Sequence, residues 1–140
     1  MTLLIALILL IAQWQKARRD PISFPFFVFS ERAADILGHI LKPRGLFLEV
    51  KTESKRKSFI GYYPTNPLKN CFDMGRSEYR KAERGLIVRR PVLIEKNITD
   101  EYLFSIEESI GFVFVTEKFK NVIEESGLVG FDFSLEVKLS

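Results

Sequence analysis

FVFVTEKFKNVIEESGLVGFDFSLEV, residues 112–137, is the stretch of sequence that decides the fold. Its apolar, β-branched start at 112–115 predicts a strand, and Thr116-Glu117 supplies a helix cap and a first-turn acid. Apolar residues spaced three and four apart then predict a helix, which Gly127 ends in the left-handed conformation. Residues 130–137 alternate as a strand with four apolar side chains expected on one face: Phe131, Phe133, Leu135 and Val137.

The same order of signals occurs once earlier in the chain. Residues 26–29 form an aromatic, β-branched run, and Ser30-Glu31 supplies the cap and the acid. Apolar spacing predicts a helix that ends at Leu41, before a strand at 46–50. When the two stretches are aligned, Ser30-Glu31-Arg32 meets Thr116-Glu117-Lys118.

Two such units predict an α+β fold: a mostly antiparallel sheet with two short amphipathic helices in strand–helix–strand pseudo-repeats. The alternative, that any capped short helix shows this pattern, stays open. Between the units, residues 59–63, 86–94 and 102–106 are also strand-like, and 51–57 form a polar, basic hairpin or loop.

Composition limits the class of protein. The 140 residues suffice for one domain, and 46% apolar content is typical of a folded globule. A single cysteine rules out an internal disulfide, and with a single histidine it excludes a zinc site of the usual kind. We expect no metal and no cofactor.

Charge is unevenly distributed along the chain. Residues 42–96 carry fourteen Lys and Arg against six Asp and Glu, whereas residues 97–140 carry three against nine. This predicts either a dipolar surface that steers a charged partner, or two segments whose charges compensate after folding.

The first residues differ from the rest, so we expect an apolar N-terminal segment at 1–20 and a single α+β domain at 21–140. The apolar run Leu3–Ala12 would span about 15 Å as a helix, half of the hydrocarbon core of a bilayer. Three interpretations remain: a short membrane anchor, a buried core strand or helix, or unrelated residues captured by a mis-assigned start.

Catalytic residues are not evident. His39, the only histidine, lies on the polar side of the first helix, and Cys71 follows the pattern of an inert buried thiol. The acid pairs at 107–108 and 124–125 diverge because neighbouring side chains point apart. No phosphate loop occurs, and Arg89-Arg90 lacks the accompanying signature of a nucleic-acid-binding motif. We therefore expect no enzyme and no nucleic-acid partner.

One segment, Tyr62–Tyr79, is not explained by packing alone. Its turn at Asn66 is followed by apolar residues, then by Asp73 and, four residues later, Ser77. These two side chains are expected to cap a short helix or to hold the loop through hydrogen bonds to the backbone.

The motifs resemble those of bacterial immunity proteins of polymorphic toxin systems, of the immunity protein 11 and immunity protein 43 kind. The resemblance rests on the strand–Ser-Glu-Arg–helix piece at 27–37, the Tyr-Tyr…Asn…Asp…Ser-x-Tyr segment at 62–79, and the ending at 103–133. It covers about residues 26–137. The N-terminal part differs, since the family has more strand-rich sequence where this chain has Leu3–Ala12. This difference suggests an N-terminally truncated or mis-started member of the family.

The resemblance implies a stoichiometric inhibitor that binds a cognate protein toxin in the bacterial cytoplasm and needs no catalysis. A buried aromatic or arginine hot spot with a charged rim that speeds association would carry the binding. The candidate toxin-binding residues are Lys55, Arg56, Lys57, Asn66, Asp73, Ser77, Tyr79, Glu107 and Glu108, with the acidic edge at Glu124 and Glu125. For Asp73 and Ser77 a structural role is slightly favoured.

Two rival functions remain. The first is a small accessory protein tethered to the inner membrane through residues 3–14, which the sequence allows but does not favour. The second is an enzyme that uses carboxylates. The sequence does not identify the toxin, the inhibitory surface or the oligomeric state.

Overall fold

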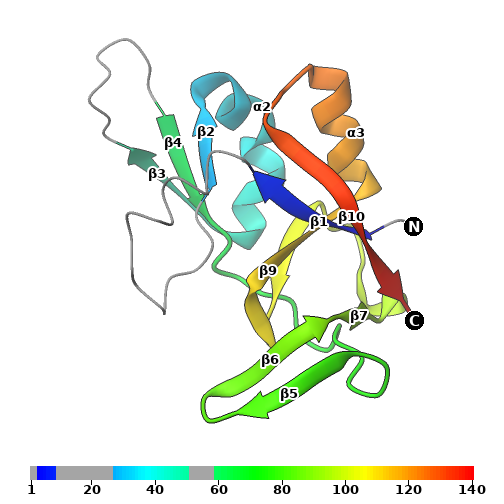
Figure 1. The fold of residues 1–140 in the computed structure, drawn as a ribbon. Coiled ribbons are helices and arrows are strands. Elements are labelled where there is room, and N and C mark those ends of the chain that lie inside the picture. Colours follow the sequence, from blue (N-terminus) through cyan, green and yellow to red (C-terminus); the bar gives the residue numbers. More distant parts are fainter. Residues whose placement is uncertain (1–2, 9–26, 51–58) are drawn as a thin grey trace.

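The computed structural model describes residues 3–8, 27–50 and 59–140. They form an α+β fold of two helices and mostly antiparallel strands, as the sequence predicts (Figure 1). The elements are β1 Leu3–Ile8, β2 Phe27–Ser30, α2 Glu31–Leu41, β3 Leu46–Val50, β4 Phe59–Tyr63, β5 Glu78–Ala82, β6 Gly85–Arg90, β7 Val92–Leu93, β8 Leu103–Ile106, β9 Ser109–Thr116, α3 Glu117–Ser126 and β10 Phe131–Leu139, with 3-10 turns at Lys42–Arg44 and Glu95–Asn97.

Three sheets organise these strands. The largest has the order β7-β10-β1-β9-β8, a second has the order β2-β4-β3, and β5 and β6 form a separate hairpin. All pairs between these strands are antiparallel except β7 with β10. The helices lie together at one end of the molecule, and the β5–β6 hairpin lies at the opposite end (Figure 1).

The two pseudo-repeats, β2-α2-β3 and β9-α3-β10, share a further feature. In neither repeat do the two strands pair with each other, because one antiparallel strand lies between them: β4 in the first repeat and β1 in the second. Both repeats are therefore split strand–helix–strand units. The intervening strand follows the repeat in the first case and comes from the far end of the chain in the second.

Local sequence signals set two of the helix ends, the start of α2 and the end of α3. Ser30 caps α2, since its hydroxyl accepts a hydrogen bond of 3.2 Å from the amide of Ala33. Gly127 has φ of +67° and ends α3, and Leu128 N donates back to the Ile123 carbonyl in the Schellman pattern. The expected Thr116 side-chain cap is wrong: the Thr116 hydroxyl donates instead to the Glu101 carbonyl at 2.7 Å.

Two hydrophobic clusters lie on opposite faces of the large sheet. The first lies between this sheet, the three-stranded sheet and both helices, and it includes Phe29, Leu37, Tyr62 and Phe119. The second lies between the large sheet, the hairpin and the segment after β4, and it includes Phe72, Leu93 and Phe114. Strand β9 contributes to both, since Val113 and Val115 pack in the first cluster and Phe114 packs in the second.

Strand β10 changes faces along its length, which corrects the expectation of a single apolar face. Between Leu135 and position 132, two residues of β10 oppose the one residue of β1 that lies between Ile5 and Leu7, so β10 carries a bulge. Phe131, before the bulge, and Phe133, within it, pack in the first cluster, whereas Val137, after it, packs in the second. A one-residue insertion reverses the alternation, so one strand serves both clusters.

The expected strand at 86–94 is divided in the structure. Pro91 lacks an amide hydrogen and stands between β6 and β7, which pair with different partners. Strand β5, which pairs with β6, was not expected from the sequence.

Residues 3–8 of the apolar N-terminal run form a strand. Strand β1 pairs with β10 on one side and β9 on the other, in the middle of the large sheet (Figure 1). The rest of that run, beyond Ile8, lies outside the described residues. Within the described ranges, neither helix has the length and apolar character needed to cross a membrane.

Candidate functional site

The segment after β4 lies along the edge strand β8. Leu68 N donates to the Ser105 carbonyl at 2.8 Å, and Glu107 N donates to the Leu68 carbonyl at 3.3 Å. Farther on, Ile94 N donates to the Cys71 carbonyl at 2.7 Å. The segment is thus fixed to the second cluster before it enters the β5–β6 hairpin.

Asp73 and Ser77 hold the base of this hairpin. The Asp73 Oδ1 atom accepts hydrogen bonds of 3.1 Å from the amides of Gly75 and Arg76. The Ser77 hydroxyl accepts from Val92 N at 2.8 Å and donates to Val92 O at 3.2 Å. A hydrogen bond from Ser140, together with those two amides, lowers the pKa of Asp73. Both side chains hold the loop through backbone hydrogen bonds, as the sequence analysis anticipated.

The other described candidates each make their own contacts. Asn66 donates through Nδ2 to the Pro43 carbonyl at 3.0 Å, and Tyr79 packs edge-on against Phe72, with ring centroids 5.8 Å apart. Lys55, Arg56 and Lys57 lie outside the described residues.

Glu107 and Glu108 lie in the turn between β8 and β9 and differ in environment. Glu107 is exposed, whereas Glu108 is partly buried, and within the described residues its buried Oε2 atom has no hydrogen-bond partner. Burial raises the pKa of Glu108. Glu124 and Glu125 are exposed on α3, distant in sequence from this turn, and Glu124 pairs with Lys120 at 3.8 Å.

Cys71 and His39 lie in different environments. Cys71 is buried in the second cluster, and burial raises the pKa of its thiol. His39 is exposed in the last turn of α2. Across 3–8, 27–50 and 59–140 no three His, Cys, Asp or Glu side chains lie close enough together to hold a metal ion.

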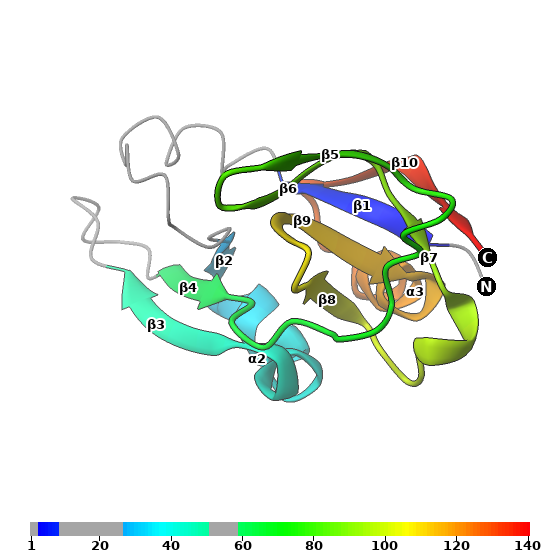
Figure 2. The same ribbon diagram turned by 90° about the horizontal axis from the view of Figure 1, so that it is seen from below.

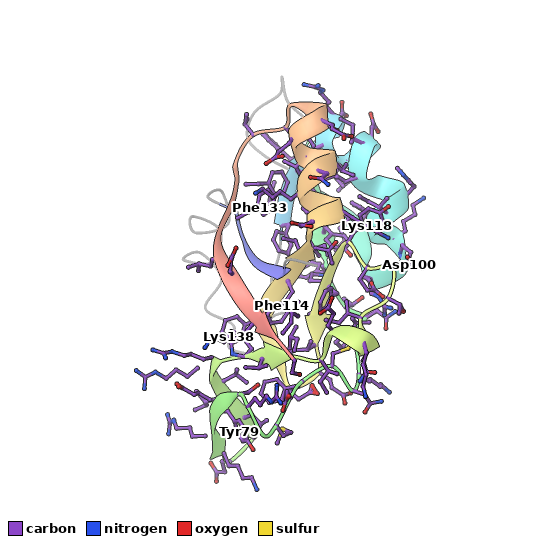
Figure 3. The ribbon with its side chains drawn as sticks, turned by 90° about the vertical axis from the view of Figure 1, so that its right-hand side faces the viewer. Tyr79, Asp100, Phe114, Lys118, Phe133 and Lys138 are labelled. Carbon is purple, nitrogen blue, oxygen red and sulfur yellow. The ribbon has the colours of Figure 1, made fainter. Side chains whose placement is uncertain are left out.

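The β5–β6 hairpin brings together charged residues that were not among the toxin-binding candidates from the sequence. Its strands are joined by a tight turn at residues 83–84, followed by Gly85 at φ of +132°, a backbone conformation that favours glycine. Six bases stand against two acids over residues 76–90: Arg76, Arg80, Lys81, Arg84, Arg89 and Arg90 against Glu78 and Glu83. Nitrogen-tipped side chains project from this end of the molecule, around the labelled Tyr79 (Figure 3).

The two faces of the hairpin differ. Tyr79 and Val88 oppose each other across the strands and pack toward the second cluster. On the other face, which we call the outer face, Arg80 opposes Ile87, and Glu78 opposes Arg90 at an ion-pair distance of 3.6 Å. The pairing shifts by one residue between these two pairs, so exposed Arg89 occupies a bulge beside them.

Ile87 is the apolar centre of the outer face, and its side chain is 45% exposed. A shallow hollow of about 460 Å³ is lined by Glu78, Tyr79, Arg80, Ile87, Val88 and Arg89. Seen from below, the hairpin lies across the front of the large sheet (Figure 2). Gly85 just before the apolar run Leu86–Val88 was the signal that could have predicted the turn of this hairpin.

No protein-family model, curated protein or solved structure matches this chain. The resemblance to immunity proteins therefore stays a prediction that rests on its motifs.

Proposed function

We propose that this protein is an immunity protein that binds and neutralises a cognate bacterial toxin. It acts in the cytoplasm as a stoichiometric inhibitor and blocks the toxin's active site or substrate access. This class of function needs a binding surface and no reacting group.

The observation that carries the proposal is the basic hairpin at the end of the motif-bearing Tyr62–Tyr79 segment. Hydrogen bonds that backbone amides donate to Asp73 Oδ1 and Ser77 Oγ fix its base, and the packing of Tyr79 on Phe72 fixes its inner face. A rigid, charged projection of this kind is suited to protein association, because little conformational entropy is lost on binding. Its excess positive charge would speed encounter with an acidic partner.

The arrangement of the other motifs is consistent with a single inhibitor domain. The Ser-Glu-Arg piece forms the β2–α2 junction, and the C-terminal motif forms β8, β9, α3 and the start of β10. Arg32 of the first motif donates to the Ser126 carbonyl at the end of α3, at 2.8 Å. The motif residues thus hold together the body that presents the hairpin.

Co-expression with the toxin encoded beside this protein tests the proposal. We expect growth rescue, and a 1:1 complex by size-exclusion chromatography with light scattering. A toxin from an unrelated system, expressed at the same level, is the control and should remain lethal. Absence of both rescue and complex with the neighbouring toxin would contradict the proposed function.

A further inference from the structure

We infer that the outer face of the β5–β6 hairpin is the toxin-binding surface, and that it meets an acidic protein surface with an apolar recess for Ile87. This inference rests on the proposed function and deepens it. None of its central residues, Arg80, Ile87 and Arg89, was among the candidates taken from the sequence.

Charge is the first argument for an acidic partner. Within the described residues, Glu78 pairs only with Arg90 on this face, and no acidic side chain lies within ion-pair distance of Arg80 or Arg89. A solvated face usually intersperses both signs of charge, because crowded like charges repel. The unmatched guanidinium groups are available to bind carboxylates, with two parallel hydrogen bonds each.

Ile87 is the second argument. It lies directly across the strands from Arg80 and is nearly half exposed at the centre of the charged face. Protein-binding hot spots combine a central apolar or arginine side chain with a polar rim that excludes water. The geometry of this face matches that arrangement.

The absence of stacking groups favours a protein over a single-stranded nucleic acid. The aromatic residue of the hairpin, Tyr79, packs inward on Phe72, and the described outer-face residues include no aromatic ring. Single-stranded nucleic acids bind largely through base stacking on such rings. Duplex nucleic acid remains as the rival occupant that the experiment must distinguish.

We expect the partner to bind the outer face of the hairpin rather than to add a strand to the edge of β5. Strand β5 has an unpaired edge in the described sheet, and Arg80 and Lys81 lie in its middle. Charged side chains on an edge strand oppose pairing with another strand.

Two matched pairs of variants test the inference in the full-length protein, with the neighbouring toxin as the probe. Arg80→Glu is compared with Lys42→Glu, an exposed base in the turn after α2, and Ile87→Ser with Leu48→Ser, an exposed apolar residue on β3. All four are surface changes, and circular dichroism checks that each variant folds.

We expect Arg80→Glu to slow association about tenfold and to weaken its salt dependence, because it removes steering charge. We expect Ile87→Ser to speed dissociation about tenfold, because it removes the central apolar contact. Both control variants should bind like the unmodified protein.

The possible failures are distinguishable. If the unmodified protein binds the toxin and both hairpin variants bind equally well, the surface is wrong and the proposed function stands. If the unmodified protein neither binds nor protects, the proposed function and this inference both fail. If it binds a 20-base-pair DNA duplex in an Arg80-dependent manner and not the toxin, the occupant is nucleic acid and the inference is overturned.

Discussion

Arg44 and Glu101, separated by 57 positions in the chain, form a two-point ion pair: Nε lies 3.0 Å from Oε2 and Nη2 lies 2.5 Å from Oε1. Arg44 closes the turn after α2, and Glu101 precedes β8. The Glu101 carbonyl also accepts the hydroxyl of Thr116, at the start of α3. The pair therefore ties the first pseudo-repeat to the second.

Removing one partner of this pair should destabilise the fold. The side chains are 24% and 12% exposed, so Arg44→Met leaves a largely desolvated carboxylate without its cation. We expect a loss of about 2 kcal/mol in the free energy of unfolding, measured by urea denaturation. The exposed pair of Lys118 with Asp100 gives the control, since Lys118→Met should cost less than about 0.5 kcal/mol. Equal effects of the two substitutions would contradict a structural role for the Arg44 pair.

The partly buried carboxylate of Glu108 predicts a pH effect on stability. Burial raises the pKa of Glu108, so above its ordinary value of 4.5 the folded state binds more protons than the unfolded state. The stability that this proton contributes is fully present below that value and is lost as the pH rises through the folded-state pKa.

Glu108→Gln should therefore be more stable than the unmodified protein at pH 7, by on the order of 0.5 kcal/mol because solvent reaches part of the side chain. The difference should vanish toward pH 4, where Glu108 is protonated in both states. Thermal melts across this range make the comparison, with exposed Glu107→Gln as the control. A variant that loses stability at pH 7 would contradict the sign.

Two glycines predict opposite effects of the same substitution. Gly127 ends α3 at φ of +67°, so Gly127→Ala should cost about 1 kcal/mol. Gly38 lies within α2, where an added Cβ would contact no atom within 4 Å, so Gly38→Ala should stabilise by about 0.5–1 kcal/mol. Denaturant melts of both variants give the two signs, and a shared sign would refute one of the helix assignments.

Interruption of β1 should abolish cooperative folding. Proline lacks the amide hydrogen that a strand with neighbours on both sides uses, and Ile5 is paired with Leu135 and Phe114. We expect Ile5→Pro to cost more than about 3 kcal/mol and to produce aggregation in size-exclusion chromatography. Ile5→Val keeps the backbone pairing and should behave like the unmodified protein. An Ile5→Pro variant with an unchanged melting transition would show that β1 does not complete the sheet.

The sequence predicted those parts of the fold that depend on neighbours within a few residues. Ser30 caps the helix that begins beside it, and Gly127 ends the helix just before it. Asp73 likewise bonds the amides of its near neighbours Gly75 and Arg76, whereas Ser77 holds the loop through Val92, fifteen positions away. Thr116 was the exception among the expected caps, because a more distant carbonyl, that of Glu101, binds its hydroxyl.

The sequence could not predict features that depend on pairing between distant segments of the chain. The alternation of apolar residues continues through the bulge of β10, so nothing local separates Phe133 from Val137 in the pattern. Similarly, Leu3–Ile8 becomes a middle strand only because β9 and β10 leave a place for it. For the β5–β6 hairpin, the sequence shows the excess of Lys and Arg. It does not show that Ile87 is exposed, because that depends on which face of the hairpin packs against the second cluster.

The position of β1 also determines the order in which this protein can fold. Residues 3–8 leave the ribosome long before their neighbours at 109–139 are made, so β1 must wait for almost the whole chain. Pairing between such distant segments slows folding, because loop closure precedes any gain from contact. The first repeat, whose strands and helix are consecutive from 27 to 63, is free of this delay. An early β2-α2-β3-β4 unit and a late closure of the large sheet would therefore appear as two kinetic phases in refolding.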